Sequence, residues 1–145
     1  MKTPWHIWVV GLVTLLWHAG GAYDYLMTVT RNAAYLDMIP EEMRAAFMAY
    51  IEAMPTWATA TWALGVWGAV AGSLLILLRS RHAVTAFLVA LFGLAATSVY
   101  TYVLAPASPM SQPDTMTLAF SGAIVLILLL ALFYSRRQVV AGKLR

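Results

Sequence analysis

Two ionisable side chains interrupt an apolar stretch near the start of the chain: His18 in the middle of residues 5–28, and Asp24 toward their end. A stretch of about 20 mostly apolar residues is long enough to cross a bilayer. Ionisable groups inside such a span are costly, so they usually face protein or a water-filled cavity. Their chemistry would be proton or cation binding, and an imidazole is also a potential haem ligand.

The spacing of these two groups argues against a catalytic dyad. Neighbours on a helix face are three or four positions apart, whereas His18 and Asp24 are six apart. At a rise of about 1.5 Å per residue, Asp24 lies roughly 10 Å further out than His18, which is near the membrane midplane.

Two interpretations stay open for each group. Asp24 is either a structural anchor, bonded to a hydroxyl or paired with an arginine of the following loop, or a protonatable or cation-binding group in a cavity. His18 is either a core histidine bonded to a carbonyl or to a Ser or Thr hydroxyl, or part of a proton relay.

Signatures of enzymes and cofactor sites are missing. His6 and His82 fall near the inner surface, too far from His18 to share one haem with it. The chain has no cysteine, which excludes disulfides and thiolate metal sites. It has no HExxH, no G-x-S-x-G and no glycine-rich phosphate loop. We therefore expect no catalytic residue, no metal and no cofactor, and a protein that is not an enzyme.

The composition is typical of an integral membrane protein. Hydrophobic residues make up 62% of the 145 residues, charged residues make up 10%, and the mean hydropathy is +0.77. A soluble domain carries roughly twice that share of charge. Four apolar stretches have membrane-spanning length, at about 5–28, 57–78, 83–104 and 115–135. Because helices satisfy their own backbone groups in lipid, we predict an all-α fold: one domain, residues 1–145, forming a four-helix transmembrane bundle.

Charge asymmetry predicts the orientation. Three basic segments are each separated from the next by two spans, so they lie on one side of the membrane: Lys2, the short turn with Arg79 and Arg81, and the tail 136–145. The acidic residues lie at or near the other side. Positively charged loops stay in the cytoplasm, so both termini are expected to be cytoplasmic. The net charge of +3 thus reflects asymmetric loops and does not indicate nucleic acid binding.

The first loop between spans contains a predicted amphipathic helix at about 40–54, on the periplasmic side. Pro40 suits a first helical position, and Glu41 and Glu42 favour the positive end of the helix dipole. Its apolar residues recur at helical spacing on one face: Ile39, Met43, Phe47, Tyr50 and Met54. We expect this helix to lie on the membrane surface or to cap the bundle.

Small residues form a stripe along the second span, at Gly65, Gly68 and Gly72. Such a face lets two helices approach closely in lipid. The stripe predicts either helix packing inside the bundle or a contact with another subunit.

Three segments resemble an uncharacterised family of small four-span bacterial inner-membrane proteins, often labelled "sugar transporter". The segments read AYDYLMTVTRNAAYL, MPTWATATWALGVWGAVAGSLLILLRSR and TSVYTYVL. The matching positions are Tyr23, Asp24, Tyr25, Arg31, Asn32, Pro55, Thr56 and Trp57. The resemblance implies a bacterial inner-membrane location. It covers most of the chain up to Leu104, and the fourth span matches only in character.

These positions all fall at the outer ends of the first two spans. We predict a polar cluster there, made by Asp24, Arg31, Asn32 and the start of the second span, which ties the amphipathic helix to the bundle. The full candidate set for this cluster or for a ligand is His18, Tyr23, Asp24, Tyr25, Arg31, Asn32 and Trp57.

Two functional hypotheses follow. The first is a non-enzymatic accessory or assembly subunit that acts through helix–helix contacts in the lipid bilayer, with other membrane subunits or further copies of itself as partners. The alternative is an oligomeric transporter of a small solute, protons or cations, which uses Asp24 and His18.

Overall fold

The computed structural model describes residues 4–105 and 115–145 of the chain. Within these ranges the chain is helical and contains no strand. The elements are α1 (Trp5–Val29), α2 (Ala33–Leu36), α3 (Glu41–Ala53), α4 (Thr56–Leu77), α5 (Ala83–Val99), the π-helical segment η1 (Tyr100–Leu104) and α6 (Thr115–Val140). The all-α fold predicted from the sequence is confirmed.

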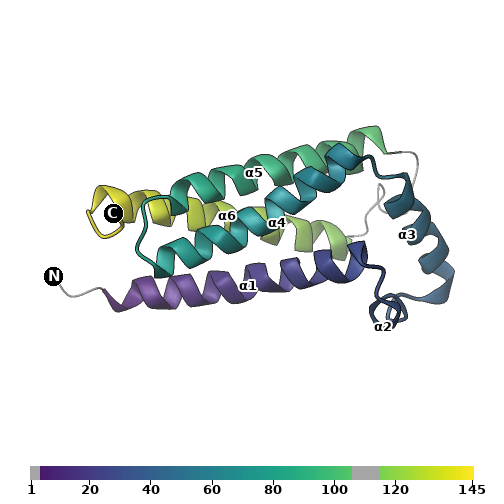
Figure 1. The fold of residues 1–145 in the computed structure, drawn as a ribbon, viewed down its shortest axis with the longest axis horizontal. Helices are drawn as coiled ribbons and strands as arrows, with labels where there is room; N and C mark the ends of the chain where they lie inside the picture. The colour runs from purple at the N-terminus through teal and green to yellow at the C-terminus, as the bar shows by residue number, and fades with distance from the viewer. Residues whose placement is uncertain (1–3, 106–114) are drawn as a thin grey trace.

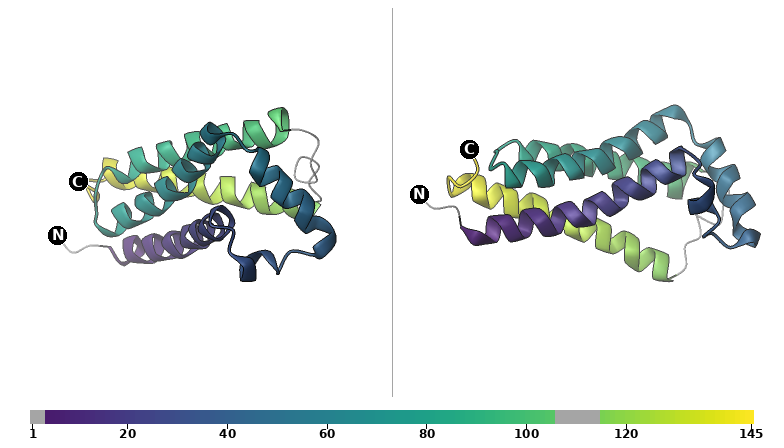
Figure 2. Two further views of the ribbon diagram at one scale, coloured as in Figure 1. Left: turned by 45° about the vertical axis from the view of Figure 1, so that its right-hand side comes forward. Right: turned by 60° about the horizontal axis from the view of Figure 1, so that its bottom comes forward.

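Four long helices lie side by side, and the short helices α2 and α3 lie at one end of them (Figure 1). The most extensive contact joins α4 and α5; α1 packs mainly on α4, and α6 mainly on α5. Contacts between α1 and α6 are few, and the N-terminal half of α6 diverges from α1 (Figure 2). The arrangement is thus a central helix pair with one further helix on each side.

Three helical stretches are long and apolar enough to cross a membrane: Thr56–Leu77, Ala83–Leu104 and Thr115–Val140. They correspond to the second, third and fourth predicted spans. The helix α1 has 25 residues but is not among them. Its polar residues, including His6, His18 and Asp24, lower its mean hydropathy. The structure therefore supports a membrane protein with three such helices.

Glycine makes the α4–α5 contact possible. A Cβ built on Gly93 would lie 2.4 Å from the amide nitrogen of Gly65 and 2.5 Å from the carbonyl oxygen of Thr61. A Cβ on Gly68 would lie 3.1 Å from the amide nitrogen of Ala90. Small residues allow such backbone-to-backbone approach. The predicted stripe on α4 is therefore covered by α5 of the same chain; its third member, Gly72, faces the ring of Phe87.

We call the end of the bundle that holds the α4–α5 turn and the end of α6 the basic end. The tail folds back there: Arg145 N–H donates to the Arg79 carbonyl at 2.9 Å, and Arg81 N–H donates to the Arg145 carbonyl at 3.0 Å. Leu144 is only 2% exposed and joins the core with Ile7 and Phe87. These contacts fix the positions of the basic side chains on the turn and on the tail.

The opposite end, which we call the acidic end, carries α2 and α3 (Figure 1). The helix α3 coincides with the predicted amphipathic helix within one residue at each end. Among its predicted apolar residues Tyr50 is buried, whereas Met43 is 48% exposed. The chain between α1 and α3 also forms the short helix α2, which we did not predict.

We expect Gly93→Ala to destabilise the protein by about 1–3 kcal/mol, the usual cost of overpacking a filled core. The added methyl would collide with backbone atoms of α4, which cannot rotate away. Unfolding in mixed micelles, followed by circular dichroism, measures the change. Gly122→Ala is the matched control, because nothing lies within 4 Å of a Cβ at Gly122. Equal stability of the two variants would contradict the close contact.

Candidate functional site

Asp24 lies on the surface near the end of α1 and accepts a hydrogen bond from the phenol of Tyr35 in α2. The chain reverses between the two residues: Thr30 ends the helix, and Arg31 adopts a left-handed conformation with φ +52°. Non-glycine residues rarely adopt such a φ. The reversal folds α2 back onto the last turns of α1, which brings a residue eleven positions away to Asp24.

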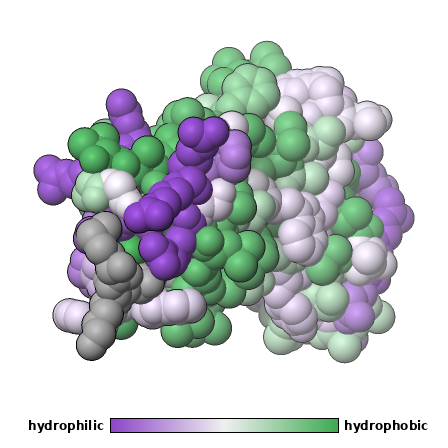
Figure 3. Space-filling view, turned by 60° about the vertical axis from the view of Figure 1, so that its left-hand side comes forward, coloured by the Kyte–Doolittle hydropathy of each residue, from purple (hydrophilic) through white to green (hydrophobic). Residues whose placement is uncertain are grey.

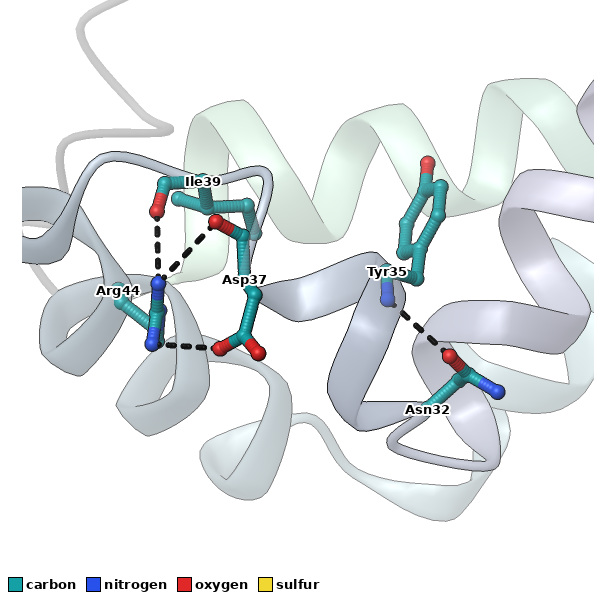
Figure 4. Close-up of polar contacts among 5 residues, drawn as sticks. All are labelled: Asn32, Tyr35, Asp37, Ile39 and Arg44. Atoms are coloured by element: carbon teal, nitrogen blue, oxygen red, sulfur yellow. Dashed lines mark hydrogen bonds and ion pairs between the residues drawn. The ribbon is translucent and has the colours of Figure 1, made fainter.

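Asn32 positions the partner of Asp24. Its Oδ1 accepts a hydrogen bond from the backbone N–H of Tyr35 at 3.1 Å and so caps α2 (Figure 4). Asn is among the favoured residues at a helix N-cap. The ring of Tyr23 packs edge-to-face on that of Tyr35, with centroids 5.9 Å apart. Asp24, Asn32 and Tyr23 therefore all act on one tyrosine.

The carboxylate of Asp24 raises the pKa of Tyr35 to about 12, chiefly through the hydrogen bond, with burial as a further cause. Deprotonation of Tyr35 would remove the hydrogen bond to Asp24 and would place a phenolate charge beside the carboxylate. At neutral pH the phenol of Tyr35 is therefore protonated and can donate its proton to Asp24.

Arg31 does not pair with Asp24 but with Glu52 in α3, at 3.2 Å. Both side chains are 56% exposed, and ion pairs at such exposure contribute little to stability. A second pair joins Arg44 of α3 to Asp37 at 2.8 Å, and the guanidinium also donates to the Ile39 carbonyl at 3.2 Å (Figure 4). Together they orient α3 relative to the α2 loop.

Aromatic residues attach α3 to the helix pair. The hydroxyls of Tyr50 and Thr101 lie 2.8 Å apart, and Tyr100 donates to the carbonyl of Ala53 at 3.2 Å. Trp57 packs edge-to-face on Tyr100 at a centroid distance of 5.8 Å. The π-helical segment η1 begins at Tyr100, which is buried beneath α3. Trp57 is thus part of an aromatic contact and not of the Asp24 contact.

His18 is buried between α1, α4 and α5. Its Nδ1 lies 2.9 Å from the hydroxyl of Ser73, and its ring lies 6.0 Å from that of Phe87. Ser73 donates its single proton to the carbonyl of Ala69 at 3.0 Å, so His18 Nδ1 is the donor in the first bond. Nε2 is then the unprotonated nitrogen; it is buried and has no partner within the described residues.

The predicted polar cluster therefore divides into separate contacts. Asp24, Tyr23 and Asn32 meet at Tyr35, Arg31 meets Glu52, and Trp57 meets Tyr100. Tyr25 packs edge-to-face on Trp62 at 4.9 Å, and His18 is held deeper in the bundle by Ser73. Sequence reasoning missed Tyr35, Glu52, Ser73, Tyr100 and Thr101 as partners. No spacing in the sequence reveals them, because each bond crosses a chain reversal or joins two elements.

Within residues 4–105 and 115–145, no three His, Asp or Glu side chains converge in a way that could hold a metal ion. The chain matches no known family model, no curated protein and no solved structure.

We expect Asp24→Asn to lower the pKa of Tyr35 from about 12 toward the ordinary value of 10.0. The change removes the carboxylate that stabilises the protonated phenol. Ultraviolet absorbance of tyrosinate measures the titration, and the difference from Tyr35→Phe isolates Tyr35 from the other tyrosines. Asp37→Asn is the matched control and should leave it unchanged. Since the pKa is raised in the folded protein, this contact should stabilise the fold fully below pH 10 and stop doing so as the pH rises to about 12.

Proposed function

We propose that the chain is a non-enzymatic bacterial inner-membrane protein with four spans and cytoplasmic termini, acting through helix–helix contacts as an accessory or assembly subunit. Two observations support the fourth span. The helix α1 has 25 residues, within the range of 22–26 residues of the three apolar stretches, and it packs along α4. Its two deepest ionisable groups, His18 and Asp24, each bond to a hydroxyl of the same chain.

The separation of charge between the two ends supports the orientation. Arg79, Arg81, Arg136 and Arg137 lie at the basic end, and the acidic residues of the described ranges lie toward the other end. The positive-inside rule then places the basic end in the cytoplasm.

The surface of α1 that faces away from α4 carries the functional proposal. A Cβ built on Gly20 or Gly21 would meet nothing within 4 Å. Leu16, one turn before Gly20, is 75% exposed. A glycine pair beside a large apolar side chain allows close packing of a further helix in lipid. The N-terminal half of α6 diverges from α1 (Figure 2), and a ring contact between Trp17 and Phe120 joins the two helices at a centroid distance of 6.0 Å.

The absence of cysteine allows a direct test. Gly20→Cys, labelled with a photo-crosslinker in native membranes, should give one discrete protein adduct, either with a partner subunit or with a second copy. Gly122→Cys is the matched control, since Gly122 is also open but lies on α6. Gentle-detergent purification should then recover the same partner in stoichiometric amount. Recovery of a free monomer with no adduct at position 20 would contradict the proposal.

One observation favours the alternative, an oligomeric transporter of a small solute, protons or cations: the buried Nε2 of His18 has no partner in the described part of the chain. If this transporter exists, Asp24→Asn should abolish pH-dependent uptake into proteoliposomes. Tyr35→Phe serves as the control, because it removes the same hydrogen bond but keeps the carboxylate. Unchanged uptake by both variants would exclude a role for Asp24 in transport.

A further inference from the structure

A groove opens at the basic end between the start of α5 and the last turns of α6. Its volume is about 470 Å³. Its lining combines the polar residues Arg81, His82 and Arg136 with the apolar residues Val84, Val139 and Val140. In a view toward this end, hydrophilic side chains lie directly beside strongly hydrophobic ones (Figure 3).

The arginines of the groove form no ion pair within 4.0 Å among the described residues. Within the described ranges, the ion pairs within 4.0 Å are Arg31–Glu52 and Arg44–Asp37, both at the acidic end. Arg81 and Arg136 therefore present guanidinium groups that are not held in an ion pair. Arginine binds phosphate oxygens through two parallel N–H donors, which makes an anion with several oxygens the complementary ligand.

The first turn of α5 adds to this field. No side chain caps its N-terminus, where His82 is the N-cap, and Thr85 of the first turn lines the groove. The N–H groups of Ala83 and Val84 donate to the carbonyls of Ser80 and Arg81, so this turn favours a bound anion through the positive end of the helix dipole. Backbone bonds to Arg145 hold the turn that carries Arg81, so this part of the lining is positioned before a ligand arrives.

We propose that this groove binds the phosphate of an anionic phospholipid, with the glycerol and first acyl carbons against the valines. The lipid is favoured over a soluble phosphate because the groove lies at the ends of two apolar helices and part of its lining is apolar. Basic pockets between spanning helices on the cytoplasmic side are suited to anionic headgroups. The proposal rests on the membrane orientation proposed above, and it assigns a separate site from the α1 surface.

The test is a titration of the detergent-solubilised full chain with short-chain phosphatidylglycerol, followed by native mass spectrometry. Arg136→Gln should weaken binding about tenfold, the loss expected for one charge-assisted contact. Arg137→Gln is the matched control: it removes the same charge at the next position, outside the groove lining, and should bind as the original chain does. Arg81→Gln should behave like Arg136→Gln.

Three further results test the identity of the ligand and the location of its site. Short-chain phosphatidylcholine should bind at least about tenfold more weakly, because its cationic choline faces the arginines. Inorganic phosphate alone should not compete at equal concentration; equal competition would show a free-anion site and overturn the lipid assignment. Equal weakening by Arg136→Gln and Arg137→Gln would show general surface attraction and overturn the groove. Loss of the α1 crosslink with retained lipid binding would count against the proposed function alone.

Discussion

Backbone contact between α4 and α5 is the constraint on which the other helix positions depend. Gly93 and Gly65 let the two helices approach until backbone atoms nearly touch, and no side chain larger than hydrogen fits between them. This approach fixes the rotation of both helices. The remaining face of α4 then presents Ser73 toward α1, and the remaining face of α5 receives α6. In lipid, where apolar side chains gain little by leaving their surroundings, such packing is a main source of association.

The rotation of α4 and α5 decides which partners the polar groups of α1 meet. His18 is buried because Ser73 and Phe87 lie opposite it. The Ser73 oxygen can accept a hydrogen bond from His18, because the Ser73 proton is donated to the carbonyl of Ala69. Asp24 lies beyond the reach of α4 and finds a donor in the short helix α2. The helix α1 therefore places one polar contact of His18 in the bundle and that of Asp24 in the loop near the surface.

The two ends of the bundle differ in how they are held. At the acidic end, hydroxyl bonds and aromatic contacts join α3 to the helix pair through Tyr50 and Tyr100, and exposed ion pairs add little. At the basic end, the tail adds two backbone hydrogen bonds to the α4–α5 turn and buries Leu144. Among the described residues, both ion pairs lie at the acidic end, and the arginines that line the groove at the basic end form none within 4.0 Å.

The sequence alone determined the long helices and α3, though not α2, because periodicity, length and terminal residues are local properties. It predicted α3 within a residue at each end and placed the glycines of α4 on one face. Only the tertiary structure decided which partner each group has. The hydrogen bond between Tyr35 and Asp24 depends on the left-handed conformation of Arg31, which the residue types around it do not predict. The choice of Ser73 for His18 and the covering of the glycine stripe by α5 depend on helix rotation, which is set by contacts between residues distant in the chain.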